Sequence, residues 1–291
     1  MPAVFCFLRQ VFRYNIHIMN RPFNSTAYRY NNEHVILALT FLLVVLVIAV
    51  TATATVCMSV VFILGIVVLG YFSTRAMHKN LLQRAELVTP ASVPGLVPVI
   101  EQSAARLQVE PVNVFIANSA SLNAYTFGMS SPKAIVLNSA LFQVMDRDEL
   151  QFILGHEMGH VRLGHTWLNS LVGGMAGIPS SSGSGAILEL AFMWWNRACE
   201  LSADLAGMLA CGKPHKAISA LVKIEAGPAS PSKASLERAL QRIEAQDDDI
   251  MNNLGELFAT HPMIIKRIEQ IRRYATTLEY RNLQTKMDGN L

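Results

Sequence analysis

The chain has 291 residues, of which 52% are hydrophobic and 15% are charged, and its formal net charge is +3. This length can fill one or two hydrophobic cores, but the composition is too apolar for an ordinary soluble enzyme. Because lysine and arginine are scattered rather than clustered, we do not expect nucleic acid to be a partner.

Residues 1–34 show no clear hydrophobic period, so the sequence pattern does not predict which structure this N-terminal segment adopts. The excess of apolar residues follows in Val35–Thr74, which contains no Asp, Glu, Lys, Arg or His. As a single helix these residues would be about 60 Å long, roughly twice the hydrocarbon thickness of a bilayer. We therefore predict a transmembrane helical hairpin over residues 35–74, with arms at about 35–50 and 56–72. The alternative is a buried helical pair in a soluble protein, although core helices usually keep some polar face.

Both flanks of this hairpin are basic, whereas its turn at Thr51–Thr55 is neutral. By the positive-inside tendency, both flanks are expected to lie in the cytoplasm. The cysteines show no Cys-x-x-Cys pairing, so we expect free thiols in a reducing compartment. These cysteines are Cys6, Cys57, Cys199 and Cys211.

After the hairpin we expect one domain at residues 75–276 and a C-terminal tail at 277–291. The first helices predicted in this domain are Arg75–Val88, which leaves the membrane, and the amphipathic Leu96–Leu107. Three short runs rich in β-branched or aromatic residues follow, with a turn signal at Gly128–Pro132, and together they predict a small antiparallel sheet. The runs are Val112–Ala117, Leu122–Phe127 and Ala134–Leu137.

The next helix has clear boundaries. Asp146 and Glu149 have the spacing of a capping box at its start, and Gly164 stops it. A loop rich in Gly and Ser follows at Val172–Ala186, where we expect a mobile lid, and Ile187–Ala210 is predicted to be a second long helix.

The remainder, from Pro214 to Arg273, has a helical pattern with breaks around Pro228–Pro231 and at Pro262. Helices thus outnumber strands along the whole chain. The predicted fold class is α+β, mainly α-helical.

The run Gly155-His156-Glu157-Met158-Gly159-His160 lies on the capped helix. Two His residues four apart project from one helix face, so both imidazoles can reach one tetrahedral zinc ion. Glu157 is rotated away from the ligand position but close enough to take a proton from a zinc-bound water as the acid/base residue. The alternative is a pair of structural histidines on a solvated face, because three fixed residues alone are a moderately specific motif.

A catalytic zinc ion needs a third protein ligand and one open position. Glu200 is a candidate because it lies on the second long helix with Asp204 one turn later. Asp204 could accept the second ring N–H of a zinc-bound His and so fix its tautomer. From spacing alone, an exposed charged helix face explains the two carboxylates equally well.

These residues resemble the membrane-associated zinc metallopeptidases that include HtpX-like proteases and CAAX prenyl endopeptidases. The resemblance covers most of residues 122–271 and runs through four ordered stretches. They are Asn123–Gly128, His156–His160, Glu200–Asp204, and Thr260–Pro262 followed by Arg267.

The resemblance implies a zincin-like metallopeptidase domain with one Zn²⁺ per chain, in a bacterial inner membrane with the catalytic domain on the cytoplasmic side. It implies that Glu200 is the third ligand and that Asp204 supports a ligand from behind. It also implies that Asn123 and Ala124 align the substrate as an added strand, and that His261 stabilises the oxyanion.

The chain departs from HtpX-like members, which generally carry a second membrane hairpin between the His pair and the Glu ligand. Here Trp167–Asn196 has only short apolar pieces, so we expect two membrane passes rather than four. Trp194 and Trp195 either rest at the bilayer interface or pack in the core. His165 follows the helix stop and is predicted to be a surface residue.

The leading hypothesis is a membrane-anchored zinc endopeptidase that cuts membrane or misfolded proteins. A different class, a membrane chaperone or scaffold that retains only structural zinc, is disfavoured because Glu157 is intact and a structural site has no use for a base. Zinc hydrolases of small amides and proteases of lipidated peptides are further alternatives. The expected edge strand suits polypeptides better than small amides, and two short passes are too few to enclose a lipid.

Overall fold

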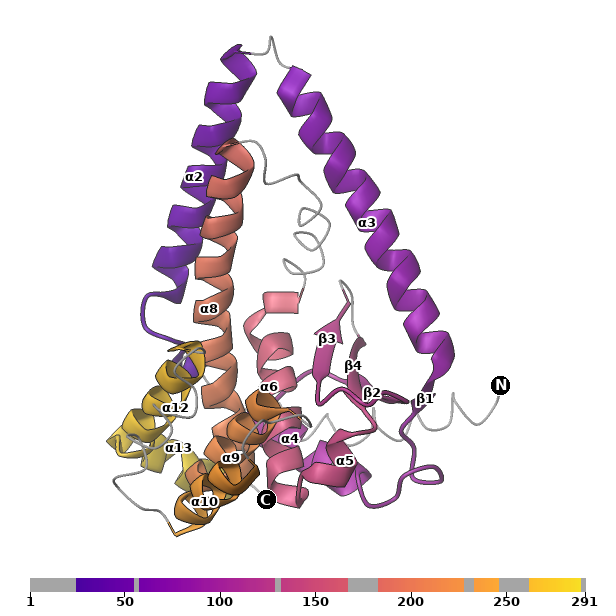
Figure 1. The fold of residues 1–291 in the computed structure, drawn as a ribbon, viewed down its shortest axis with the longest axis vertical. Coiled ribbons are helices and arrows are strands. Elements are labelled where there is room, and N and C mark those ends of the chain that lie inside the picture. Colours follow the sequence, from indigo (N-terminus) through magenta and orange to yellow (C-terminus); the bar gives the residue numbers. More distant parts are fainter. Residues whose placement is uncertain are drawn as a thin grey trace.

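The computed structural model describes residues 25–54, 58–128, 132–166, 183–227, 233–245 and 262–288. Some predicted features lie outside these residues: Cys6, Cys57, His261 and most of the loop Val172–Ala186. The end of that predicted loop is described and is helical, because α8 (Gly183–Cys211) begins earlier than its sequence pattern suggests. The early turns of α8 lie alongside α2 (Glu33–Ala54), a tertiary contact that local sequence does not reveal (Figure 1).

A short 3₁₀ helix, Ser25–Tyr28, leads into α2, and α3 (Met58–Arg84) follows. These two helices meet at one end and diverge, so that α2 reaches α8 while α3 reaches the sheet (Figure 1). Large apolar side chains are exposed on both helices, with Leu42 on α2 at 65% and Leu69 on α3 at 71%. Within the described ranges, one segment, Glu33–Ala52, is long and apolar enough to cross a membrane.

The helix predicted at Arg75–Val88 is confirmed only as far as Arg84, where α3 ends. The next residues form strand β1 (Ala85–Leu87), which pairs antiparallel with β2 (Val112–Ala117). The prediction fails here because a short segment beside an open sheet edge gains inter-strand hydrogen bonds that its own pattern does not indicate.

The sheet has the strand order β1-β2-β4-β3, with β3 at Ala124–Phe127 and β4 at Lys133–Asn138. The predicted hairpin is confirmed, since β3 and β4 pair antiparallel across the predicted turn. The prediction that the whole sheet is antiparallel is wrong, because β2 and β4 are parallel. The connection after β2 carries the chain past the position of β4, so β3 becomes an outer strand and β4 returns in the direction of β2. The sheet is therefore mixed, with β4 buried along its length.

Helices predicted after the hairpin are present, with small shifts of their ends. They are α4 (Val97–Leu107), α6 (Arg147–Leu163), α9 (Pro214–Ala226), α10 (Lys233–Glu244) and α12 (Pro262–Ala275). Two further helices, α5 (Leu141–Val144) and α13 (Leu278–Asp288), are not predicted by the sequence pattern. The main core joins α4, the sheet, α6 and α8 through fully buried side chains such as Leu107, Ile135, Leu154 and Leu209. Residues predicted as a C-terminal tail contain α13, whose Leu283 packs on this core.

The helices α6 and α8 pack at unusually close range because glycine lies at their contact. A Cβ atom on Gly155 would come within 2.3 Å of the Cβ of Ala210, and one on Gly159 within 2.6 Å of the Cβ of Ala206. Gly207 on α8 is equally constrained, since its Cβ would lie 2.7 Å from the carbonyl oxygen of Phe152. The two backbones can therefore approach only where these side chains are absent.

We expect Gly159→Ala to lower the free energy of unfolding by about 1–3 kcal/mol, because the added methyl group must push α6 away from α8. Gly95→Ala is the matched control, since no atom lies within 4 Å of its added Cβ. Denaturant unfolding of both variants in detergent would measure the difference. Equal free energies of unfolding would show that α8 can move away from the added methyl group without loss of stability.

Candidate metal centre

Helix α6 begins and ends where the sequence predicts. The Asp146 side chain accepts from the backbone N–H of Glu149 at 2.9 Å, and the Glu149 carboxylate accepts from the backbone N–H of Asp146 at 2.8 Å. Gly164 ends the helix with a left-handed backbone, at φ 81°. This fixed helix places His156 and His160 one turn apart on the side that faces α8, where both are buried.

Three predicted ligands converge across the contact between α6 and α8. The Nε2 atoms of His156 and His160 are 3.3 Å apart, and each lies 3.5 Å from a carboxylate oxygen of Glu200. The donor atoms of the three residues all lie within 4.8 Å of one another. Two imidazole nitrogens and a carboxylate are a donor set that suits zinc. Burial opposes ionisation of Glu200, but its hydrogen bonds to the two histidines hold the pKa of this carboxyl well below its usual range.

Asp204 lies behind His156, with its Oδ1 atom 3.0 Å from the Nδ1 atom of the ring. Arg267 on α12 donates to both oxygens of Asp204, at 2.6 Å each. Burial would raise the pKa of Asp204, but the charge and hydrogen bonds of Arg267 lower it, so the carboxylate stays ionised. An ionised Asp204 accepts the Nδ1 proton of His156 and leaves the Nε2 lone pair for a metal.

Burial alone would lower the pKa of His156, but its hydrogen bonds to Asp204 and Glu200 raise it to about 10. Without a metal, the carboxylates around this imidazole therefore favour a bound proton. A divalent cation would supply positive charge to the same carboxylates. The charge balance of the residues thus fits a metal ion.

The prediction that His165 is a surface residue is wrong, because its side chain is only 2% exposed. Its Nδ1 atom lies 2.9 Å from Nδ1 of His160, and its Nε2 atom lies 3.1 Å from the Glu33 carboxylate. The turn at Gly164 folds the chain back, so the next residue packs against Trp195 and under the start of α2. Of the two tryptophans, Trp195 packs in the core at 2% exposure, whereas Trp194 is 49% exposed.

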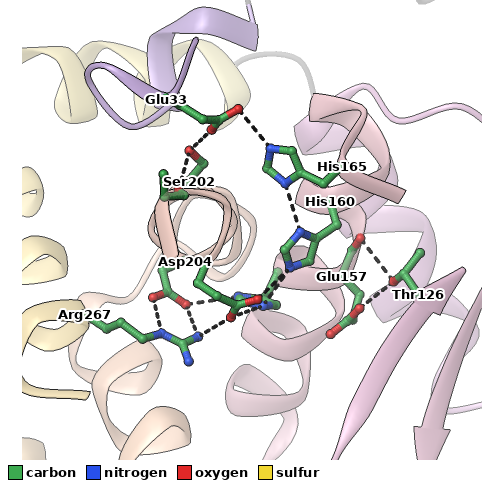
Figure 2. A network of polar contacts seen from close by, with 11 residues as sticks. Glu33, Thr126, Glu157, His160, His165, Ser202, Asp204 and Arg267 are labelled. Atoms are coloured by element: carbon green, nitrogen blue, oxygen red, sulfur yellow. Dashed lines mark hydrogen bonds and ion pairs between the residues drawn. The ribbon is translucent and has the colours of Figure 1, made fainter. Parts of the chain in front are cut away.

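Glu157 points toward the sheet rather than toward α8 (Figure 2). The hydroxyl group of Thr126 on β3 donates to its carboxylate. Sequence reasoning missed Thr126, although a polar residue inside a short apolar strand is a weak signal of such a role. Asn123 directly precedes β3, and Ala124 is the first residue of that strand and pairs with Leu137 of β4. Strand β3 contacts α6, the helix that carries Glu157.

A cavity of about 400 Å³ opens beside the ligands, between α8 and α12. Its lining includes the charged residues Glu200 and Arg267 and the apolar residues Met193, Met263 and Ile264. The candidate metal centre is therefore next to a space that can take a side chain of a bound molecule.

The sequence profile of peptidase family M48 matches residues 94–275, more than half of the chain. The chain belongs to peptidase family M48. This family consists of metallopeptidases, so the resemblance to HtpX-like metallopeptidases is confirmed.

Individual relatives agree with this assignment. Plastoglobule-localized metallopeptidase 48, chloroplastic, of Arabidopsis thaliana is 27% identical over 233 residues, which cover 75% of this chain and 68% of the relative. A protease HtpX homolog of Pyrococcus abyssi is 28% identical over 229 residues, and one of Streptococcus uberis is 26% identical over 231 residues. Each of these two matches covers 66% of this chain and 77% of the relative.

Glu200→Gln should weaken metal binding about 10- to 100-fold, because a neutral amide is a poor substitute for a carboxylate ligand. Glu225→Gln is the control, since Glu225 lines the same cavity but does not belong to the converging donor set. Metal content after dialysis, measured by elemental analysis, would compare the two. Full retention of metal by Glu200→Gln would exclude Glu200 as a ligand.

Proposed function

We propose that the protein is a zinc-dependent endopeptidase that holds one Zn²⁺ per chain through His156, His160 and Glu200. The observation that carries this proposal is the convergence of three donor atoms beside an unliganded carboxylate, Glu157, in a chain of the M48 family. A structural zinc site would need a fourth protein ligand and no base, whereas this donor set leaves one position open.

Zinc bound there would lower the pKa of its water to roughly 7. The Glu157 carboxylate would act as the general base: it would accept a proton as water adds to the peptide carbonyl, and return it to the leaving amine as the C–N bond breaks. Thr126 holds this carboxylate toward the sheet, and Asp204 with Arg267 fixes the ring of His156. Each of these groups is held by hydrogen bonds before a substrate arrives, which limits reorganisation during the reaction.

The substrate in this proposal is an extended polypeptide that adds to the outer edge of β3 at Asn123 and Ala124. The strand order supports this mode, because β3 is the end strand of the described sheet and lies next to α6. His261 would stabilise the oxyanion. It directly precedes α12, and Arg267 of that helix lies 3.4 Å from Glu200, so α12 reaches the ligands.

Residues 35–74 would anchor this peptidase to a lipid bilayer as a two-pass hairpin, preceded by residues 1–34. The first arm is supported by the apolar segment Glu33–Ala52, of which only 11% is buried. The second arm is supported by exposed apolar side chains on α3, including Val61 and Leu69. The catalytic domain at 75–276 and the tail at 277–291 would face the cytoplasm of a bacterial inner membrane, where the enzyme removes membrane or misfolded proteins.

The test is Glu157→Gln, purified with zinc bound and compared with the parent chain on unfolded casein. We expect the parent to cleave casein and the variant to be slower by about 10²- to 10⁴-fold, since the general base is lost. Equal rates would refute the proposed mechanism. Stoichiometric zinc with no cleavage by the parent would instead favour the chaperone or scaffold.

Thr126→Val should lower the casein cleavage rate by about 10-fold or more, because the hydrogen bond to the Glu157 carboxylate is lost. Thr126→Ser is the matched control and keeps the hydroxyl group. Steady-state rates of both variants would be measured at equal zinc content. If the Val and Ser variants were equally active, the contact between Thr126 and Glu157 would not contribute to the reaction.

A further inference from the structure

A second polar cluster lies behind His160, on the side away from Glu200. It joins Glu33 at the start of α2, His165 after α6, and Ser202 on α8 (Figure 2). All three side chains are at most 2% exposed. The reaction described above uses none of them, and Glu33 is 132 residues from His165 in sequence.

The protons in this cluster have one consistent arrangement when the Nε2 atom of His160 binds a metal. The Nδ1 atom of His160 then carries the proton and donates it to Nδ1 of His165, 2.9 Å away. Neutral His165 must therefore hold its own proton on Nε2, which faces the Glu33 carboxylate at 3.1 Å. Each ring nitrogen in the chain from His160 to Glu33 then has its donor or acceptor partner.

Glu33 is held in place by several groups besides His165. Arg29, one helical turn earlier in sequence, forms an ion pair with its carboxylate, and the Ser202 hydroxyl donates to it. Arg29 also donates to the carbonyl oxygen of Leu163 at 3.1 Å, and the backbone N–H of Tyr30 donates to Ser202 at 2.8 Å. The segment before α2 is thereby fixed to the end of α6 and to α8.

The donor atoms of Glu33, His165 and Cys199 also lie within 4.8 Å of one another, the spacing of a possible second metal site. Two features oppose metal binding there. Arg29 already neutralises the charge of Glu33. Burial and the nearby charge of Glu33 raise the pKa of the Cys199 thiol, whereas a metal needs the thiolate. A hydrogen-bonded relay accounts for the contacts better than a second ion does.

We propose that Glu33 and His165 are positioning residues that form a buried relay to His160, fixing the tautomer and orientation of this ligand. The inference rests on the proposed metal site, since it assigns a role to the partner of one ligand. It means that the first residue of the proposed anchor helix is part of the metal centre. The expected contribution is that of a residue supporting a ligand from behind, about 10- to 100-fold in metal affinity.

The experiment measures zinc affinity by chelator competition in full-length protein carrying Glu157→Gln, so that no cleavage interferes. His165→Leu fills similar space without polar atoms, and we expect it to bind zinc at least ~10-fold more weakly than the parent. In His165→Gln the amide oxygen can accept from His160 and the amide N–H can donate to Glu33. We expect His165→Gln to recover most of the zinc affinity. With cobalt in place of zinc, its absorption spectrum should match that of the parent, whereas the spectrum of His165→Leu should differ.

Cys199→Ser is the matched control, because Cys199 belongs to the possible second metal site but not to the relay. It should bind one zinc per chain with parental affinity. A second zinc ion in the parent that is lost in both Cys199→Ser and His165→Leu would overturn the relay in favour of a metal site. Unchanged affinity in His165→Leu, or equal loss in the Leu and Gln variants, would also overturn it.

Glu33→Gln keeps the inference testable if His165→Leu does not fold. Because the carboxylate charge at the end of the relay is lost, we expect zinc binding about 10-fold weaker, and unchanged binding would overturn the relay. The readout is independent of peptidase activity. A parent chain that binds zinc but cleaves nothing would refute the proposed function and leave the relay intact.

Discussion

The close contact between α6 and α8 is the constraint on which the rest of the structure depends. Gly155, Gly159 and Gly207 remove the side chains that would otherwise separate the two backbones. Each helix carries its polar groups near these glycines, so the same contact that closes the apolar core brings two imidazoles to one carboxylate. A tightly packed interface holds such groups more precisely than a loop would. The sheet and the other helices support this pair from outside.

Much of α6 could be predicted because its signals are local: a capping box, an apolar period and a terminal glycine lie within the helix itself. The strand segments were also visible in the sequence. Their order in the sheet could not be predicted, since nothing in the sequences of β2 and β4 indicates whether β3 lies between them or outside them. His165 was misplaced for the same reason. A helix stop usually leads to the surface, and only the folded chain shows that α2 covers this one.

The two histidines are supported in parallel ways. Behind His156 lies a carboxylate paired with an arginine, Asp204 with Arg267. Behind His160 there is also a carboxylate paired with an arginine, Glu33 with Arg29, but the imidazole of His165 lies between this pair and His160. Buried carboxylates are tolerated only when a partner offsets their desolvation, and both arginines come from outside the α6–α8 pair. The site is built on α6 and α8, and its charge balance is completed by the segment before α2 and by helix α12.

The position of β3 at the end of the sheet has a consequence for what such an enzyme could act on. The backbone N–H and C=O groups of a folded protein are already hydrogen-bonded within its own helices and sheets. A chain that pairs with β3 must have backbone groups that are not yet hydrogen-bonded. Side chains would matter less than the state of the backbone. Discrimination would then follow conformation rather than a sequence motif, so well-folded neighbours in the same compartment would escape cleavage while unravelled segments of the same proteins would not.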